Sequence, residues 1–193
     1  MAHQDQSPQD RSPQNRSPQD RSPQDTSRQQ ALTHVDEAGA ARMVDVSDKG
    51  VDARTAVATG VVRTTTEVVE LLRSDDLPKG DALATARIAG IMAAKRTPDL
   101  VPLCHPIAIS GVRVDLETGD AEVRITATVR TTDRTGVEME ALTAVTGAGL
   151  ALHDMVKAVD PAAVLDGVRV ERKEGGKTGI WVRNAPEAQE ENQ

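Results

Sequence analysis

The sequence has almost no aromatic residues. It contains no Phe and no Tyr, and Trp181 is its single tryptophan. The hydrophobic core must therefore come from Val, Leu, Ile, Met and Ala, and stacking of exposed nucleic-acid bases on aromatic side chains is disfavoured. Cysteine is equally scarce, because Cys104 alone can form neither an internal disulfide nor a zinc site with several cysteines.

Long apolar runs and excess positive charge are also missing. No stretch approaches the roughly 18 apolar residues of a membrane span, and the N-terminal MAHQDQSPQD lacks the apolar part of a signal peptide. The 193 residues carry 23 basic and 30 acidic side chains, a net charge of −7. We therefore expect a soluble cytoplasmic protein with one main domain, no nucleic-acid partner and no membrane partner.

Both ends of the chain have the composition of disordered segments. Residues 7–25 repeat a unit written SPQD, RSPQN, RSPQD, RSPQD, and residues 185–193 read APEAQEENQ. Such residues cannot bury enough apolar surface to offset chain entropy. The interpretation is a disordered tail at 1–30, a folded domain at 31–184 and a second disordered tail at 185–193.

Hydrophobic periodicity predicts the elements of the folded domain. Apolar and polar residues alternate in the strand candidates, whereas apolar residues recur at helical spacing in the helix candidates. The predicted strands are 56–63, 112–116, 123–130, 168–172 and 180–182, and the predicted helices are 67–72, 81–96 and 137–159. This order predicts an α+β, ferredoxin-like fold, an antiparallel sheet with helices packed on one face.

The stretch LVPLCHPI places Cys104 beside His105 between two prolines. A metal site would need further ligands, and the other histidines show no ligand spacing. Adjacent side chains of an extended segment point to opposite sides, so His105 is poorly placed to activate Cys104 as a nucleophile. The residues alone favour a buried, inert Cys104, and leave His105 as either a structural turn residue or a binding residue.

The loop ERKEGGKTG, residues 171–179, contains the Gly-Lys-Thr of a P-loop. That motif requires glycine where this chain has Glu171 and a helix where it predicts a strand, so a P-loop hydrolase is disfavoured. Lys173 and Lys177 suit phosphate binding through ammonium groups and exposed amides. A solvated charged hairpin explains the same residues equally well.

Glu140, Asp154 and Lys157 share one face of the helix predicted at 137–159. Either they form an ordinary solvated face, or they serve catalysis. At roughly 1.5 Å per residue, Glu140 and Asp154 lie about 21 Å apart, which is too far for one small-molecule site. Catalysis would then require a helix break near Gly147 and Gly149 or a site completed by a neighbouring chain.

Several long motifs, in order, closely resemble the MoaC family of molybdenum cofactor biosynthesis, the cyclic pyranopterin monophosphate synthases. They are LTHVDEAGAARMVDVSDK, KGDALATARIAGIMAAKRTPDLVPLCHPI, TGVEMEALTAV, DMVKAV and KEGGKTG. The resemblance spans about residues 31–184. It implies a homohexamer, a trimer of dimers, with active sites at subunit interfaces.

The resemblance also implies a lyase that splits a phosphorus–oxygen bond. Its small-molecule substrate, (8S)-3′,8-cyclo-7,8-dihydroguanosine 5′-triphosphate, derives from GTP and is rearranged to cyclic pyranopterin monophosphate with release of diphosphate. No cofactor or protein-bound metal is implied, and a magnesium ion on the triphosphate stays open.

The site residues are carried over from the family motifs. The catalytic set is Asp154, Lys157, Lys79 and His105. The substrate-binding set is Leu103, Cys104, His105, Glu138, Met139, Glu140, Lys173, Lys177 and Arg54. On this interpretation Cys104 contacts the substrate as part of the wall and is not a nucleophile.

The main alternative is a nucleotide-binding or regulatory module of the same fold that does not turn over substrate. Asp154 and Lys157 are both present, which argues against it, because a degraded relative would lose one of them. The alternative predicts binding without product.

The N-terminal repeat extends beyond the start of the family resemblance near Leu32. We expect a chain lacking residues 1–30 to keep full turnover, because a segment that cannot fold contributes no fixed groups to the site. A steady-state assay of full-length and shortened protein checks this, and a large loss of activity would contradict it.

Overall fold

The computed structural model describes residues 39–74, 77, 81–177 and 179–183. The two predicted tails and Lys79 lie outside the described residues. No helix in the described part of the chain is long and apolar enough to cross a membrane.

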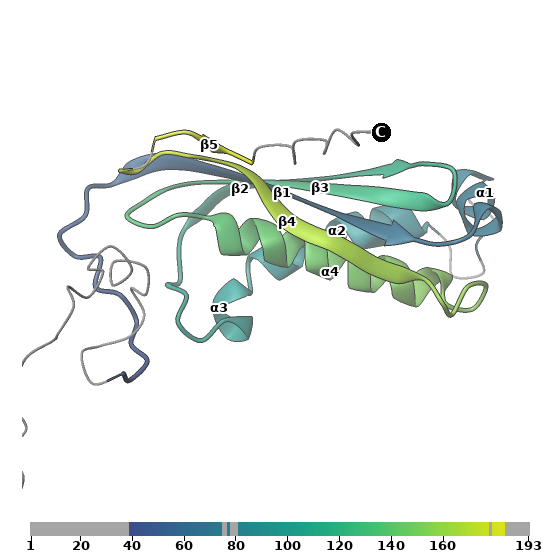
Figure 1. Ribbon diagram of the computed structural model, residues 1–193, viewed down its shortest axis with the longest axis horizontal. Coiled ribbons are helices and arrows are strands. Elements are labelled where there is room, and N and C mark those ends of the chain that lie inside the picture. Colours follow the sequence, from purple (N-terminus) through teal and green to yellow (C-terminus); the bar gives the residue numbers. More distant parts are fainter. Residues whose placement is uncertain (1–38, 75–76, 78–80, 178, 184–193) are drawn as a thin grey trace, which may run out of the picture.

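One antiparallel sheet carries the fold, with α2 and α4 against one of its faces (Figure 1). The elements follow in the order β1 Asp52–Arg63, α1 Thr66–Ser74, α2 Ala82–Ala94, α3 Thr97–Leu100, β2 Ile109–Thr118, β3 Glu122–Asp133, α4 Glu138–Val156, β4 Val164–Glu174 and β5 Trp181–Val182. The five strands are arranged β2-β3-β1-β4-β5, with antiparallel pairing throughout. The predicted α+β, ferredoxin-like class is confirmed.

The core lies between the sheet and the two long helices. Every second residue of β1 from Ala56 to Val62 is buried, as the alternation predicts. These side chains meet buried aliphatic residues of β3 and α4, including Ile125, Val145 and Leu152. Among the described residues the core is entirely aliphatic, which matches the composition.

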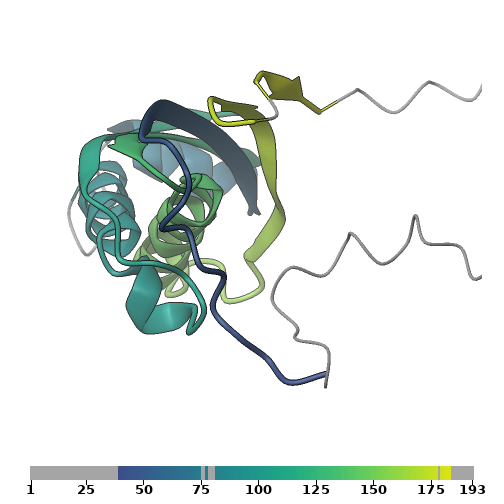
Figure 2. The ribbon, with the colours of Figure 1, turned by 90° about the vertical axis from the view of Figure 1, so that its left-hand side faces the viewer.

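Helices α2 and α4 lie side by side beneath the sheet (Figure 2) and approach closely through small residues. A Cβ atom added to Gly90 would lie 2.8 Å from the carbonyl oxygen of Ala144 and 3.1 Å from Cβ of Ala148. Glycine therefore permits the close helix contact at this position.

Gly90→Val is expected to lower the free energy of unfolding by about 1–3 kcal/mol, because overpacking forces two helix backbones apart. Chemical denaturation followed by circular dichroism measures the change. Gly111→Val is the matched control, since a Cβ at Gly111 meets open space. Equal stability of the two variants would contradict the tight packing of α2 on α4.

Helix α4 is continuous from Glu138 to Val156. The predicted helix at 137–159 is therefore present but ends earlier. Of the two alternatives for a catalytic role of its residues, the helix break near Gly147 and Gly149 does not occur. Sequence analysis missed α3, Thr97–Leu100, in which Pro98 stands at the start of the helix, where its missing N–H costs nothing.

Candidate active site

The turn between α3 and β2 presents the LCHP residues to the N-terminal end of α4. The Cys104 N–H donates to the carbonyl of Val101 at 3.0 Å. The Thr131 hydroxyl donates to the carbonyl of Ala108 at 2.6 Å and fixes the end of the turn to β3. The turn borders a cavity of about 320 Å³ lined by Leu103, Cys104, His105, Thr135, Gly136, Glu138, Met139 and Glu140. We call it the histidine cavity.

Glu140 forms the floor of the histidine cavity. Only 3% of its surface is exposed. Burial raises the pKa of its carboxyl, a hydrogen bond from its own backbone N–H lowers it, and the nearby charge of Glu138 raises it further. The interpretation of Glu140 as part of a solvated helix face is therefore wrong, because the turn at 101–108 covers this end of α4.

The glycine loop after β4 carries the cationic side chains beside this cavity. Gly175 and Gly176 adopt φ values of +93° and +68°, which favour glycine. A Cβ atom at Gly176 would overlap the guanidinium of Arg54, so the loop and this side chain are in contact. The Arg54 Nε in turn donates to the carbonyl of Asp133 at 2.9 Å.

A second, smaller cavity of about 80 Å³ gathers these cations, and we call it the cationic cavity. Its lining includes Arg54, Lys173 and Lys177 together with Gly136 and Glu138. The Lys173 ammonium lies 3.3 Å from a carboxylate oxygen of Glu138. Because β5 and not a helix follows the loop, the geometry also disfavours a P-loop.

A third cavity, of about 490 Å³, lies between the segment before β1 and the glycine loop. Its lining residues are Asp45, Asp48, Lys49, Gly50, Asp52, Arg54, Arg134, Thr135, Gly136, Gly176 and Lys177. Gly136 lines all three cavities. The three therefore adjoin at one end of the molecule, the end that faces the viewer in Figure 2.

Asp154 and Lys157 lie at the opposite end of α4, at the right of Figure 1. The Lys157 ammonium lies 2.7 Å from a carboxylate oxygen of Asp154, and the two side chains are 53% and 57% exposed. Since α4 is unbroken, this pair remains about 21 Å from Glu140 along the helix. Among the described residues of the predicted catalytic set, one chain therefore does not bring the Asp154–Lys157 pair to His105.

Comparison with known proteins identifies the family. The sequence model of the family described as the MoaC family matches residues 43–176. The chain belongs to the MoaC family. It is 69% identical over 156 residues to the cyclic pyranopterin monophosphate synthase of Streptomyces coelicolor, covering 81% of this chain and 92% of that protein.

Other MoaC relatives are similar over nearly the same span. The cyclic pyranopterin monophosphate synthase of a Nocardioides species is 68% identical over 155 residues, which cover 79% of this chain and 95% of that protein. Cyclic pyranopterin monophosphate synthase 2 of Mycobacterium tuberculosis H37Rv is 62% identical over 156 residues, or 81% and 93% of the two chains. The residues of the histidine cavity, the Asp154–Lys157 pair and the glycine loop as far as Gly176 all lie within the span that matches the MoaC family model.

Three further residues that line the candidate site were missed by sequence reasoning. Asp45, Lys49 and Arg134 line the third cavity but were not singled out. Hydrogen bonds from Ser47 and, less strongly, the charge of His105 lower the pKa of the Asp45 carboxyl. The segment MVDVSDK carried the only available signal, because it formed part of the family resemblance.

Cys104 is half-buried and lines the histidine cavity, so the thiol is less buried than the residues alone led us to expect. The turn at 101–108 leaves one side of the residue open to the cavity. Partial burial raises the pKa of its thiol, and the negative charge of Glu140 raises it further. The thiol therefore stays protonated at neutral pH, which suits a wall contact and not a nucleophile.

Cys104→Ala is expected to keep turnover within about threefold of wild type, because a protonated thiol gives no nucleophilic rate advantage. Alkylation of wild type by iodoacetamide is expected to be slow at pH 7 and to accelerate only at alkaline pH. Steady-state kinetics and labelling rates measure both effects. Complete loss of turnover in Cys104→Ala would contradict the assignment.

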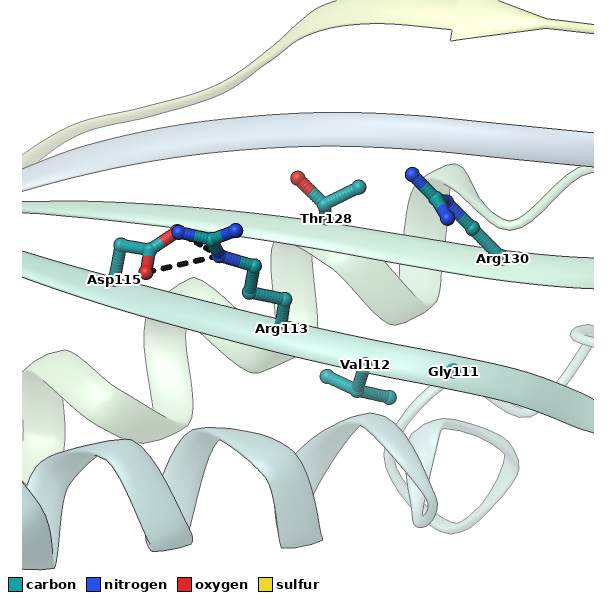
Figure 3. Close-up of a pocket in the computed structure, with 6 residues that line it drawn as sticks. All are labelled: Gly111, Val112, Arg113, Asp115, Thr128 and Arg130. Atoms are coloured by element: carbon teal, nitrogen blue, oxygen red, sulfur yellow. Dashed lines mark hydrogen bonds and ion pairs between the residues drawn. The ribbon is translucent and has the colours of Figure 1, made fainter.

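A separate hollow of about 400 Å³ lies on the face of the sheet turned away from the helices (Figure 3). Arg113 donates to both carboxylate oxygens of Asp115, at 2.7 and 3.1 Å, while Arg130 and Thr128 extend from β3. None of the predicted site residues lines this hollow. The candidate active site is therefore the group of cavities around Gly136.

Proposed function

We propose that this chain is a cyclic pyranopterin monophosphate synthase of molybdenum cofactor biosynthesis. It converts (8S)-3′,8-cyclo-7,8-dihydroguanosine 5′-triphosphate to cyclic pyranopterin monophosphate and diphosphate, and so acts as a phosphorus–oxygen lyase. The observation that carries the proposal is the junction at Gly136 between the histidine cavity and the cationic cavity in a chain of the MoaC family.

The two cavities suit the two ends of this substrate. The guanine-derived ring system fits the histidine cavity, where Met139 gives an apolar contact and His105 and Glu140 give polar ones. Arg54, Lys173 and Lys177 hold the triphosphate in the neighbouring cationic cavity. When the cyclic phosphate closes, a substrate oxygen bonds to the α-phosphorus and the bond to diphosphate breaks, so these cations stabilise the leaving group.

Rearrangement of the ring system requires proton transfers. His105 is available from the turn, and Asp154 with Lys157 forms a carboxylate–ammonium pair suited to acid–base chemistry. Lys79 completes the proposed catalytic set from the motif KGD. The chain requires no resident cofactor in this proposal, and a magnesium ion enters, if at all, with the triphosphate. We place the reaction in the cytoplasm, where GTP is available.

A second copy of the chain supplies Asp154 and Lys157 to the site. The outward surface of the helices near this pair carries exposed apolar side chains, with Leu150 at 62% exposure one helical turn before Asp154. Ile88 and Met92 on α2 are exposed at 63% and 46%. Burial of such side chains favours association.

Two-fold symmetry explains how the two ends of α4 form one site. In a dimer whose helix faces pack antiparallel, the C-terminal end of one α4 lies against the N-terminal end of the other. The Asp154–Lys157 pair of one copy then faces the histidine cavity of its partner. We propose this dimer as the unit of a hexamer, a trimer of dimers.

Turnover of the proposed substrate tests the function. Purified full-length protein is supplied with the cyclised guanosine triphosphate, and pyranopterin product and diphosphate are followed together. Both should form in equal amounts. Tight binding without product would instead support a non-catalytic module, and absence of binding would exclude the proposed function.

A further inference from the structure

The segment before β1 forms a turn that is held by its own hydrogen bonds. A carboxylate oxygen of Asp45 accepts from the Ser47 backbone N–H at 2.8 Å and from the Ser47 hydroxyl at 2.6 Å. The Lys49 N–H donates to the carbonyl of Val46 at 3.0 Å. We call residues 45–49 the Asp45 turn. These bonds fix its shape, although its side chains are mostly exposed.

Arg134 attaches the Asp45 turn to the rest of the domain. Arg134 directly follows β3, and its Nη1 donates to the carbonyl of Ser47. The same residue donates its backbone N–H to the side chain of Asp133 at 2.7 Å. The turn is thus held at the end of β3, beside the glycine loop.

The attached turn places Lys49 in the wall of the third cavity, which also contains Arg54 and Lys177. Both of these residues line the cationic cavity as well. Through Arg54 and Lys177, the wall that carries Lys49 is continuous with the lining of the cationic cavity.

The carboxylates of the third cavity do not neutralise Lys49. Asp52 lies 3.8 Å from the Arg54 guanidinium, and the Asp45 carboxylate is engaged by Ser47. Asp48 also lines the cavity, although it precedes Lys49 in sequence without forming an ion pair with it. Within the described ranges, no carboxylate lies within ion-pair distance of Lys49. An ammonium group with no anionic partner among the described residues, in the wall of a cavity lined by three further cations, Arg54, Arg134 and Lys177, is available to an incoming anion.

We propose that Lys49 binds the phosphate chain of the substrate, and that Arg134 is a positioning residue that holds the Asp45 turn through the Ser47 carbonyl. The inference rests on the proposed function, because it assigns further residues to the triphosphate end of the same site. The Asp45 turn, which precedes β1, then forms one wall of the active site, and the glycine loop, which follows β4, forms another.

Binding of inorganic triphosphate to the full-length protein tests the inference without requiring turnover. Titration calorimetry at several salt concentrations compares wild type with Lys49→Gln, Lys49→Arg, Arg134→Gln and the double variant. A lost charge-assisted contact to phosphate should weaken binding roughly 10-fold to 100-fold in Lys49→Gln and reduce the salt dependence. Lys49→Arg, which keeps the charge, should restore most of the affinity.

The double variant tests how Arg134 acts. If Arg134 works through Lys49, Arg134→Gln weakens binding, and the double variant binds no more weakly than Lys49→Gln. If the affinity losses of Lys49→Gln and Arg134→Gln instead multiply in the double variant, the positioning role of Arg134 is overturned. Arg63→Gln is the control, since this exposed arginine at the far end of β1 should leave binding unchanged. Thermal melting of every variant checks that the fold is intact.

Turnover kinetics separate failure of this inference from failure of the proposed function. A wild type that forms product, with unchanged triphosphate affinity and KM in Lys49→Gln, would overturn the role of Lys49 alone. A wild type that forms no product would overturn the proposed function. If the proposed function and the role of Lys49 are both correct, Lys49→Gln raises KM, while the KM of Lys49→Arg stays near that of wild type.

Discussion

Asp154→Asn and Lys157→Gln are each expected to lower kcat at least about 100-fold and to leave the melting temperature nearly unchanged. Acid–base groups that act in the transition state contribute factors of about 100 to 10,000. The ion pair itself is largely exposed, and exposed pairs contribute roughly 0–1 kcal/mol to folding. Product formation and thermal unfolding of the same samples measure both quantities.

Asp115→Asn is the matched control for this prediction. Asp115 also accepts from a neighbouring cation, Arg113, at 2.7 Å, but on the face of the sheet turned away from the helices. Its loss should change neither kcat nor stability appreciably. Near-normal turnover of Asp154→Asn would show that the Asp154–Lys157 pair takes no part in the reaction. A large drop in melting temperature would instead assign the pair a structural role.

Glu140→Gln is expected to stabilise the protein at pH 7 by on the order of 1 kcal/mol while lowering turnover roughly 10-fold or more. Burial raises the pKa of this carboxyl in the folded state. The unfolded chain therefore ionises first as pH rises, and stability falls from the unfolded pKa up to the folded pKa. Glutamine keeps the shape of the side chain and removes this penalty.

The pH dependence distinguishes this origin from a general packing effect. The stabilisation by Glu140→Gln should be present at neutral pH and vanish in acid, below both pKa values, where wild-type Glu140 is protonated in either state. Melting temperatures between acid and neutral pH measure it. Glu117→Gln, at an exposed position of β2, is the control and should show no such trend. A destabilised Glu140→Gln at pH 7 would contradict the stated origin.

Alternation predicted the centres of the strands and missed their ends. In β1 it predicts 56–63, but the strand begins at Asp52, and its first three residues pair with Thr131–Asp133 of β3. In β4 it predicts 168–172, but the strand begins at Val164 and includes Asp166 and Gly167. Backbone hydrogen bonds extend these strands beyond their buried positions. Because only buried positions produce alternation of apolar and polar residues, the sequence does not reveal the ends.

The residues of the histidine cavity were predicted because they stand in two compact motifs. The LCHP turn and the start of α4 are distant in the chain, and packing of α3 and its turn on α4 brings them together. Lys49 and Arg134 were missed, because they stand in separate segments of the sequence and only the third cavity relates them. Sequence spacing cannot reveal such a relation.

The distance between Glu140 and Asp154 along α4 was predictable from the sequence, whereas the way in which both could serve one site was not. Spacing gives about 21 Å between Glu140 and Asp154, and a kinked helix or a partner chain satisfies that distance equally well. The unbroken hydrogen bonding of α4 removes the kink. A site shared between two copies is the remaining way to bring Asp154 to His105.

Mixing two inactive variants tests the shared site most directly. His105→Ala and Asp154→Asn, each expected to be inactive alone, are co-expressed at equal levels, purified together and assayed for pyranopterin product. In a two-fold dimer with shared sites, each mixed pair contains one intact site, so random pairing should restore about one quarter of wild-type turnover. Activity no higher than that of the separate variants would contradict a site built from two chains.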